Sequence, residues 1–208
     1  MLAAMPAPSK TTDAEIVAAV RRLLESRGRD GFSMNDIASA VGIRAPSLYG
    51  RFADRATLFD AVERELWREL ARRLAGAVSG RDPIRILTAQ AHAYRAFAKS
   101  NPEGYALLYR IDADRSEVGV QLRAEAVSPT MPAFVALAGE RGALAAARVL
   151  TPFLHGFVSM ELSGAFRLGG GLDAAFEHGV ATILNGIKPA PRRATTRSKL
   201  RQPASSER

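Results

Sequence analysis

The chain has 208 residues and no cysteine, which excludes disulfides, thiolate zinc sites and cysteine nucleophiles. Apolar residues make up 47 % and charged residues 24 %, the balance of a globular protein with one large or two small domains. The formal net charge is +8, but residues 188–208 hold seven Lys or Arg and one Glu, so this segment carries +6 and residues 1–187 carry only +2.

The first residues give no sign of a targeting segment. Residues 1–11 lack a basic region followed by a long apolar core, so we expect a disordered tail and not a signal peptide. No apolar run approaches the length of a membrane span, and a chain without cysteine suits a reducing compartment. We therefore expect a cytoplasmic protein with no membrane partner.

The stretch from residue 12 to residue 187 is almost entirely helical in pattern, without sustained apolar/polar alternation or an Asn-Gly hairpin signal. Thr12 and Glu15 form a capping box at the start of the first helix, and Gly28 follows its end. Ser33 is expected to cap the second helix, with Asp36 at its third position. The pattern predicts an all-α fold of about nine helices.

Later helix starts are marked by capping residues. Asp54 precedes a long helix to about residue 78, and Asp82-Pro83 and Asn101-Pro102 each place a capping side chain before a proline. The stretch 128–132 interrupts the next segment. Two long helices should follow at about 141–166 and 174–187, and the Pro-, Ser- and Arg-rich residues 188–208 should form a disordered basic tail.

Function is carried by the stretch 33–52, "SMNDIASAVGIRAPSLYGRF". Two short helices must cross closely here, because Ala38 is small and Gly42 sits between them. A small residue, a glycine four positions on and an apolar residue, Leu48, six beyond that is the spacing of a helix-turn-helix. The second helix then opens near Pro46 and exposes its N-terminal end, as a reader of the DNA major groove requires.

Side chains suited to DNA surround this second helix. Arg44 fits a guanine edge or a phosphate, Ala45 and Pro46 offer apolar contacts, and the hydroxyls of Ser47 and Tyr49 suit phosphates or base edges. Arg51 and Arg55 are expected to bind phosphates, the latter together with free N–H groups at the next helix start. The predicted DNA-binding residues are Ser33, Arg44, Ala45, Pro46, Ser47, Tyr49, Arg51 and Arg55. The alternative is a plain helical hairpin with ordinary surface residues.

Residues 42–58, "GIRAPSLYGRFADRATL", resemble the DNA-binding domain of TetR-family transcriptional regulators. Two positions depart from the family pattern, because Arg51 stands where His is usual and Arg55 where Lys is usual. The resemblance implies a helix-turn-helix DNA-binding domain over residues 12–60 and a ligand-binding and dimerisation domain over residues 61–187. It also implies a double-stranded DNA operator, a small-molecule effector and a homodimer formed by the last two long helices.

The stretch 150–166, "LTPFLHGFVSMELSGAF", is similar to the C-terminal domain of one TetR subgroup that carries a Trp before a His-Gly pair. His155-Gly156 fits that pattern, whereas Thr151 stands in place of the Trp. Candidate residues for lining a ligand pocket are His92, Tyr94, Phe97, Tyr105, Tyr109, Phe153, His155, Phe157 and Met160. Each of them is equally suited to ordinary core packing, and His155 fits a close helix crossing.

Three functions compete at this point. The first is a ligand-responsive regulator, more specifically a repressor, that binds a near-palindromic operator as a homodimer. The second is a non-specific DNA-organising protein that uses the basic tail. The third is a small enzyme that uses His155 with Glu161, but no phosphate-binding loop or nucleophile elbow supports it, so we expect no enzymatic activity. The three histidines show no metal-ligand spacing, and we expect neither metal nor cofactor.

Overall fold

The protein is an all-α molecule in the computed structural model, which describes residues 11–110 and 117–187. The predicted tails, residues 1–11 and 188–208, lie outside this part of the chain except for Thr11. The described residues hold ten α-helices and one short 3-10 helix, close to the nine or so expected. The helices are α1 (Asp13–Arg27), α2 (Met34–Ala40), α3 (Ala45–Tyr49), α4 (Arg55–Gly76), α5 (Pro83–Ser100), α6 (Pro102–Leu108), α7 (Glu117–Val127), η1 (Ser128–Thr130), α8 (Met131–Ala138), α9 (Glu140–Leu162) and α10 (Leu172–Gly186).

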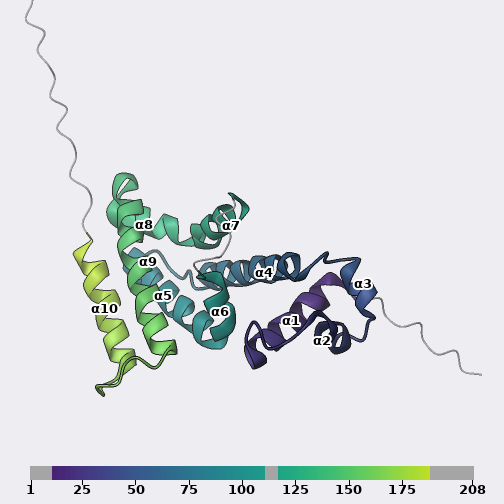
Figure 1. Ribbon diagram of the computed structural model, residues 1–208. Coiled ribbons are helices and arrows are strands. Elements are labelled where there is room, and N and C mark those ends of the chain that lie inside the picture. The colour runs from purple at the N-terminus through teal and green to yellow at the C-terminus, as the bar shows by residue number, and fades with distance from the viewer. Residues whose placement is uncertain (1–10, 111–116, 188–208) are drawn as a thin grey trace, which may run out of the picture.

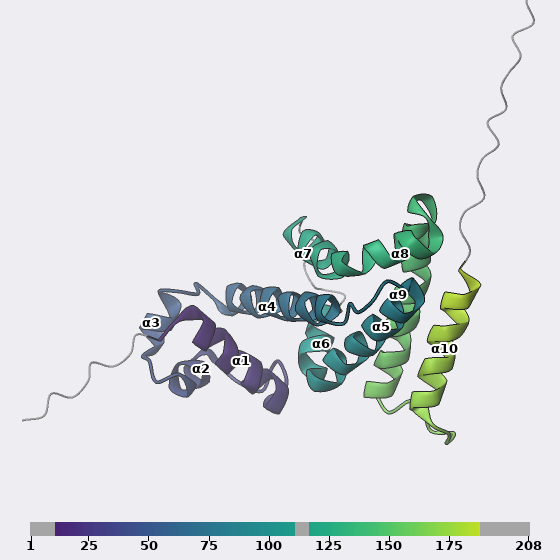
Figure 2. The same cartoon turned by 180° about the vertical axis from the view of Figure 1, so that it is seen from behind.

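The molecule is elongated, with α1–α3 at one end and the paired helices α9 and α10 at the other (Figure 1). Seen from behind, α4 runs from the end that holds α3 into the larger bundle formed by α5–α10 (Figure 2). Because α4 passes through the predicted domain boundary at residue 60, the two parts share a continuous helix. One apolar core extends from Ile16 in α1 to Leu184 in α10.

Four of the helix starts in the described residues follow from capping side chains in the sequence. Thr12 and Ser33 each form a complete capping box, Asp54 accepts a hydrogen bond from the backbone N–H of Thr57, and Asp82 accepts one from that of Ile84. Each cap satisfies N–H groups that the first turn of a helix leaves without a partner. These cap predictions are confirmed.

The cap prediction at Asn101 is wrong. Its side-chain amide instead donates to the carbonyl of Phe97 at 3.0 Å, and its Oδ1 accepts a hydrogen bond from Arg21 of α1 at 2.8 Å. Asn101 is 7 % exposed, so these tertiary partners take priority over a local cap. Helix α9 also ends earlier than expected, at Leu162, because Gly164 adopts a left-handed φ of 65° just beyond it.

Candidate nucleic-acid interface and interior cavity

The short helix α3 is positioned by a tight turn after α2. Gly42 has a φ of 71°, and the backbone N–H of Ile43 donates to the carbonyl of Ala38 at 3.0 Å while that of Gly42 donates to Ser39 at 3.2 Å. This pair of bonds is a Schellman motif, whose left-handed residue is normally glycine. Leu48 is fully buried and fixes the inner face of α3. The predicted helix-turn-helix geometry is therefore present.

The outer face of α3 presents the side chains expected for DNA. Arg44, Pro46 and Ser47 are exposed, and Tyr49 is 49 % exposed, which is unusual for so large a side chain. Arg44 is the N-cap residue of α3, but its guanidinium can only donate and so cannot cap the helix. Its exposed side chain is available for an acceptor on DNA. Ala45 is half-buried against the core and offers less surface than the sequence suggested.

Ser33 lies at the start of α2 with its hydroxyl engaged. Its Oγ accepts from the backbone N–H of Asp36 at 3.2 Å, and its own N–H donates to the Asp36 carboxylate at 2.7 Å. The hydrogen bonds from Ser33 hold the pKa of Asp36 below its usual value. A DNA contact from Ser33 would have to share this capping box.

Arg51 does not point freely outward as the sequence suggested. Its guanidinium donates to the carboxylate of Asp13, in the first turn of α1, at 3.1 Å. Both side chains remain partly exposed, at 31 % and 69 %. The ion pair joins the end of α3 to the start of α1, and a DNA phosphate would compete with Asp13 for this arginine.

Arg55 differs more strongly from its predicted role in phosphate binding. Its guanidinium donates to the backbone carbonyls of Arg29 and, at 2.6 Å, of Phe32. It also lies over the rings of Phe32 and Phe59. One N–H group at the start of α4, that of Thr57, is also engaged, because it donates to the carboxylate of Asp54 at 2.7 Å. Arg55 is thus a structural tie between α4 and the α1–α2 loop.

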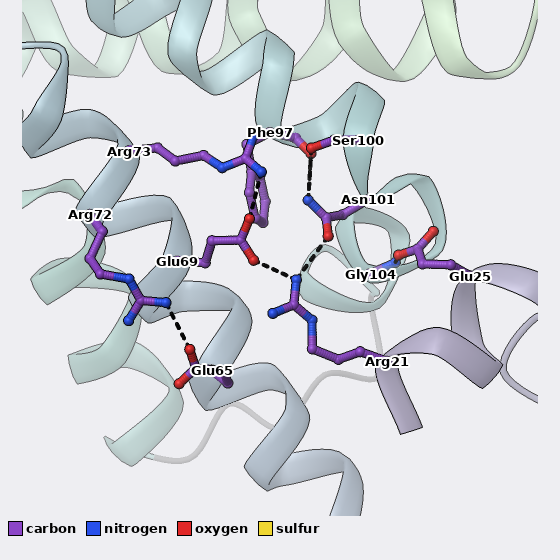
Figure 3. A network of polar contacts seen from close by, with 10 residues as sticks. All are labelled: Arg21, Glu25, Glu65, Glu69, Arg72, Arg73, Phe97, Ser100, Asn101 and Gly104. Atoms are coloured by element: carbon purple, nitrogen blue, oxygen red, sulfur yellow. Dashed lines mark hydrogen bonds and ion pairs between the residues drawn. The ribbon is translucent and has the colours of Figure 1, made fainter. Parts of the chain in front are cut away.

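A polar junction connects α1–α3, the predicted DNA-binding part, to the larger bundle, and the sequence did not predict it (Figure 3). Arg21 of α1 donates to Glu69 of α4 and to Asn101, and Arg73 pairs with Glu69 at 2.6 Å. The carboxylate of Glu25 accepts from the backbone N–H of Gly104 at 2.8 Å and from the next N–H upstream at 3.1 Å. Only the helical spacing of Arg21 and Glu25 could have indicated that they share a face.

Four of the predicted pocket residues form one interior network. The hydroxyls of Tyr94 and Tyr105 lie 2.8 Å apart, Tyr94 donates to Tyr109 at 3.0 Å, and Tyr105 contacts Nδ1 of His155 at 2.7 Å. Since each hydroxyl has one proton, Tyr105 then donates to Tyr94, and Nδ1 of His155 donates to Tyr105. Burial lowers the pKa of His155 and so favours the neutral imidazole, with its proton on Nδ1.

The other predicted pocket residues lie elsewhere. Phe153 and Phe157 pack against Phe176 of α10, with Phe157 at 5.2 Å between ring centroids. Phe97 is fully buried beneath Arg73 of α4. His92 and Met160 are exposed, and the ring of His92 lies 5.5 Å from that of Phe176. Neither belongs to the interior network, and their place in a ligand pocket stays a prediction. Apolar character and helical spacing alone do not separate these three environments.

The structure does not pair His155 with Glu161, the combination considered above for a small enzyme. Glu161 accepts hydrogen bonds from Arg95 at 2.7 Å and from Lys99 at 3.1 Å, whereas His155 contacts Tyr105. Six positions along a helix place the two side chains on different faces. Within the described ranges, no group of three or more His, Asp or Glu side chains could hold a metal ion.

A small cavity of about 40 Å³ lies in the bundle, beside Tyr94. Its walls come from α4, α5, α7, η1, α8 and α9, and no charged side chain lines it. The lining residues are Leu74, Leu87, Gln90, Ala91, Tyr94, Val127, Thr130, Phe134, Leu150, Thr151 and Leu154. Of these, only Tyr94 was among the predicted pocket residues, because the walls are built from helices distant in sequence.

Comparison with known proteins agrees with both parts of the molecule. Residues 16–62 match the family described as bacterial regulatory proteins, tetR family, and residues 87–183 match the tetracycline repressor-like C-terminal domain. The chain is also similar to the uncharacterized HTH-type transcriptional regulator Rv0681 of Mycobacterium tuberculosis. The two are 28 % identical over 161 residues, which span 76 % of this chain and 73 % of that protein.

Solved structures share the fold. A protein of unknown function from Rhodococcus sp. RHA1 superimposes with a TM-score of 0.76 at 22 % identity, covering 88 % of this chain and 99 % of that one. BioQ, solved with its natural double-stranded DNA operator, superimposes with a TM-score of 0.60 at 22 % identity, over 86 % of this chain and 98 % of BioQ. The arrangement of helices is therefore shared over nearly the whole of each chain.

Proposed function

Because this chain belongs to the TetR family of DNA-binding transcriptional regulators, we propose that it is a ligand-responsive repressor that binds a near-palindromic operator as a homodimer. The observation that carries the proposal is the exposed face of α3, where Arg44, Ser47 and Tyr49 surround a helix fixed from below by Leu48. Such a face suits the major groove. The operator-bound structure of BioQ, which has the same fold, supports this role.

The homodimer is supported by the outer surface of the last two long helices. Helix α9 is apolar, yet only 28 % of its most apolar 18 residues are buried, and Leu144, Val149 and Met160 are largely exposed. By length and composition α9 is also long enough to cross a membrane, which is weak evidence in a single helix. Burial against α9 and α10 of a second subunit explains the exposed apolar side chains. As a DNA-binding regulator, the protein would act in the cytoplasm.

A two-fold dimer would present two copies of α3 to successive turns of one DNA face, about 34 Å apart. Because the two copies of α3 are related by a two-fold axis, the operator should be near-palindromic. An effector that favours a dimer with a different spacing would release the DNA, provided that its affinity differs between the two shapes.

The route from an effector to α3 is supported by the polar junction of Figure 3. Helix α6 carries Tyr105 of the interior tyrosine network, and its N-terminal N–H groups bind Glu25 of α1. A Cβ on Gly104 would lie 3.0 Å from Leu66 of α4, so α6 also packs tightly against α4. A displacement of α6 would therefore act on both helices that support the DNA-binding part.

The test is selection of bound DNA from random sequences, followed by footprinting with the purified full chain. We expect a protected near-palindrome with half-sites one helical turn apart. Tyr49→Ala should weaken binding to every sequence, whereas Arg44→Ala should relax the preference at one base position. Equal affinity for random and selected DNA would refute the sequence-specific part of the proposal.

The alternative, a non-specific DNA-organising protein, is favoured by one observation about charge. Residues 12–60 contain seven Arg and seven Asp or Glu, so the DNA-binding part is formally neutral and the positive charge lies in residues 188–208. Deletion of residues 188–208 separates the two functions. An operator-binding protein keeps its preference for the selected sequence and loses some salt-dependent affinity, whereas an organising protein loses most of its affinity.

A further inference from the structure

The interior cavity has one distinctive polar feature, the side chain of Gln90 on α5. Gln90 is 2 % exposed and lines the cavity. Its Nε2 donates to the carbonyl of Leu74 at the end of α4 and to that of Pro129 in η1, both at 3.1 Å. Its Oε1 is buried and has no hydrogen-bond partner among the described residues.

The orientation of this amide is fixed by its two donated bonds. Turning the amide over would place Oε1 against two carbonyl oxygens, which cannot donate. Gln90 therefore presents an acceptor, and not a donor, to its surroundings. An unpartnered buried carbonyl is rare in native proteins and is a site where a donor is favoured.

The cavity walls do not supply that donor. The hydroxyl of Thr130 donates to the carbonyl of Val127 at 2.7 Å, and that of Tyr94 donates to Tyr109 at 3.0 Å. The hydroxyl of Thr151 does not donate to Oε1 either, since that atom has no partner among the described residues. Apart from these residues and Gln90 the wall is aliphatic or aromatic, and it contains no charged side chain. An anion would therefore meet a carbonyl dipole and no counter-charge here.

We propose that the effector of this protein is a neutral, largely apolar compound that donates one hydrogen bond, from an O–H or N–H group, to Oε1 of Gln90. This inference rests on the proposed ligand response and adds the chemical class of the ligand. Apolar walls provide affinity for the body of the compound, and the single acceptor selects for its donor. A carboxylate of the same shape is excluded by the missing counter-charge.

The volume of the cavity shows how such a compound acts. A space of about 40 Å³ accommodates a water molecule, whereas ligand pockets usually measure about 300 Å³ or more. An effector must therefore move the walls apart. Since Gln90 joins α5 to the end of α4 and to η1, the compound binds at the point where these three elements are held together. A wider cavity then differs in helix position from the state described here.

The experiment compares three probes of one shape by isothermal titration of the full chain: cyclohexanol, which donates, cyclohexanone, which only accepts, and cyclohexanecarboxylate, which is charged. We expect cyclohexanol to bind about fivefold more tightly than cyclohexanone, the ratio that one ordinary hydrogen bond provides. The carboxylate should give no measurable binding. Equal affinity for alcohol and ketone, or no binding of the alcohol, overturns the inference.

Two variants locate the acceptor. Gln90→Leu removes it and should abolish the preference for alcohol over ketone. Thr151→Val, which removes the one hydroxyl that α9 contributes to the cavity wall, should leave the preference intact. A preference that persists in folded Gln90→Leu also overturns the inference. If Gln90→Leu fails to fold, the probe comparison on wild-type protein and on Thr151→Val still decides.

Binding to the selected operator is measured on the same samples. A preference for the alcohol without sequence-specific DNA binding refutes the proposed function but supports the inferred ligand class. Specific DNA binding without an alcohol preference does the opposite.

Discussion

At the first turn of α4, the guanidinium of Arg55 lies 4.8 Å from the ring centre of Phe32 and 4.9 Å from that of Phe59, and donates to two backbone carbonyls. We predict that Arg55→Ala lowers the free energy of unfolding by about 2 kcal/mol, because two partly buried carbonyls lose a charged donor. Arg55→Lys should not restore it, since an ammonium lacks the planar fork. Urea denaturation followed by circular dichroism measures both.

Arg44→Ala is the matched control, because Arg44 is exposed and makes no capping bond. It should keep wild-type stability and lose DNA affinity. If Arg55→Ala unfolds like the wild type and loses only DNA affinity, Arg55 is a phosphate contact and its structural assignment is wrong.

A second prediction at this scale concerns acid stability. Hydrogen bonds from Arg95, and then from Lys99, hold the pKa of Glu161 below its usual value of 4.5. A carboxyl whose pKa is lower in the folded state adds stability above pH 4.5, and this stability is lost as the pH falls through the folded pKa. Glu161→Gln should therefore cost about 3 kcal/mol at pH 7 and flatten the decline in stability below about pH 5.

The control for the acid prediction is Glu125→Gln, at an exposed position of α7 outside the proposed subunit contact. Its unfolding free energy should follow the wild-type pH profile. Parallel profiles for wild type and Glu161→Gln would show that the ion pair with Arg95 does not contribute to acid sensitivity.

Among the elements, α6 depends on a residue outside itself. Its N-terminal N–H groups bind the carboxylate of Glu25, which lies on α1, whereas Asn101 at its own N-cap position makes no capping bond. We predict that Glu25→Gln lowers stability by about 1 kcal/mol, since a neutral amide interacts less favourably with a helix N-terminus. Hydrogen exchange at residues 103 and 104 should become faster.

Glu65→Gln is a suitable control for the α6 prediction, because Glu65 pairs with Arg72 within α4 at 2.8 Å and does not bridge the two parts of the molecule (Figure 3). It should leave exchange in α6 unchanged. Equal protection of residues 103 and 104 in Glu25→Gln would mean that α6 is held by packing against α4 alone.

The elements also show what the sequence could and could not predict. Starts at Thr12, Ser33, Asp54 and Asp82 were predictable because a cap depends on residues within one turn. The left-handed turn at Gly42 was predictable for the same reason. Asn101 was mispredicted because its partner Arg21 lies 80 positions away.

The candidate site follows the same rule. The exposed face of α3 was predictable from contiguous residues. The intramolecular contacts of Arg51 and Arg55 were not, because Asp13 and the carbonyl of Phe32 come from other segments. Of the residues that line the cavity around Gln90, only Tyr94 was predicted. Oε1 of Gln90 has no partner among the described residues because the amide donates both its hydrogens to carbonyls of α4 and η1. No local sequence pattern predicts that these elements lie side by side.

For the whole molecule, the separation of α3 from α9 and α10 places the proposed DNA-binding face and the proposed subunit contact at opposite ends (Figure 1). A change on α9 should therefore alter assembly without disturbing the fold of the DNA-binding part. Val149 is suited to the test because it is 56 % exposed on the outer face of α9. Replacing it removes no buried contact, so any loss of assembly reports the interface itself.

We predict that the wild-type chain sediments at about twice 22.3 kDa at micromolar concentration, and that Val149→Glu sediments at 22.3 kDa with an unchanged far-ultraviolet spectrum. A buried carboxylate without a partner is costly, and the two-fold axis introduces it twice. The matched control is Val120→Glu on α7, which is 60 % exposed and lies away from α9 and α10 (Figures 1 and 2). It should remain dimeric. A wild-type monomer would contradict the two-helix docking on DNA, and dissociation by Val120→Glu alone would move the interface to α7.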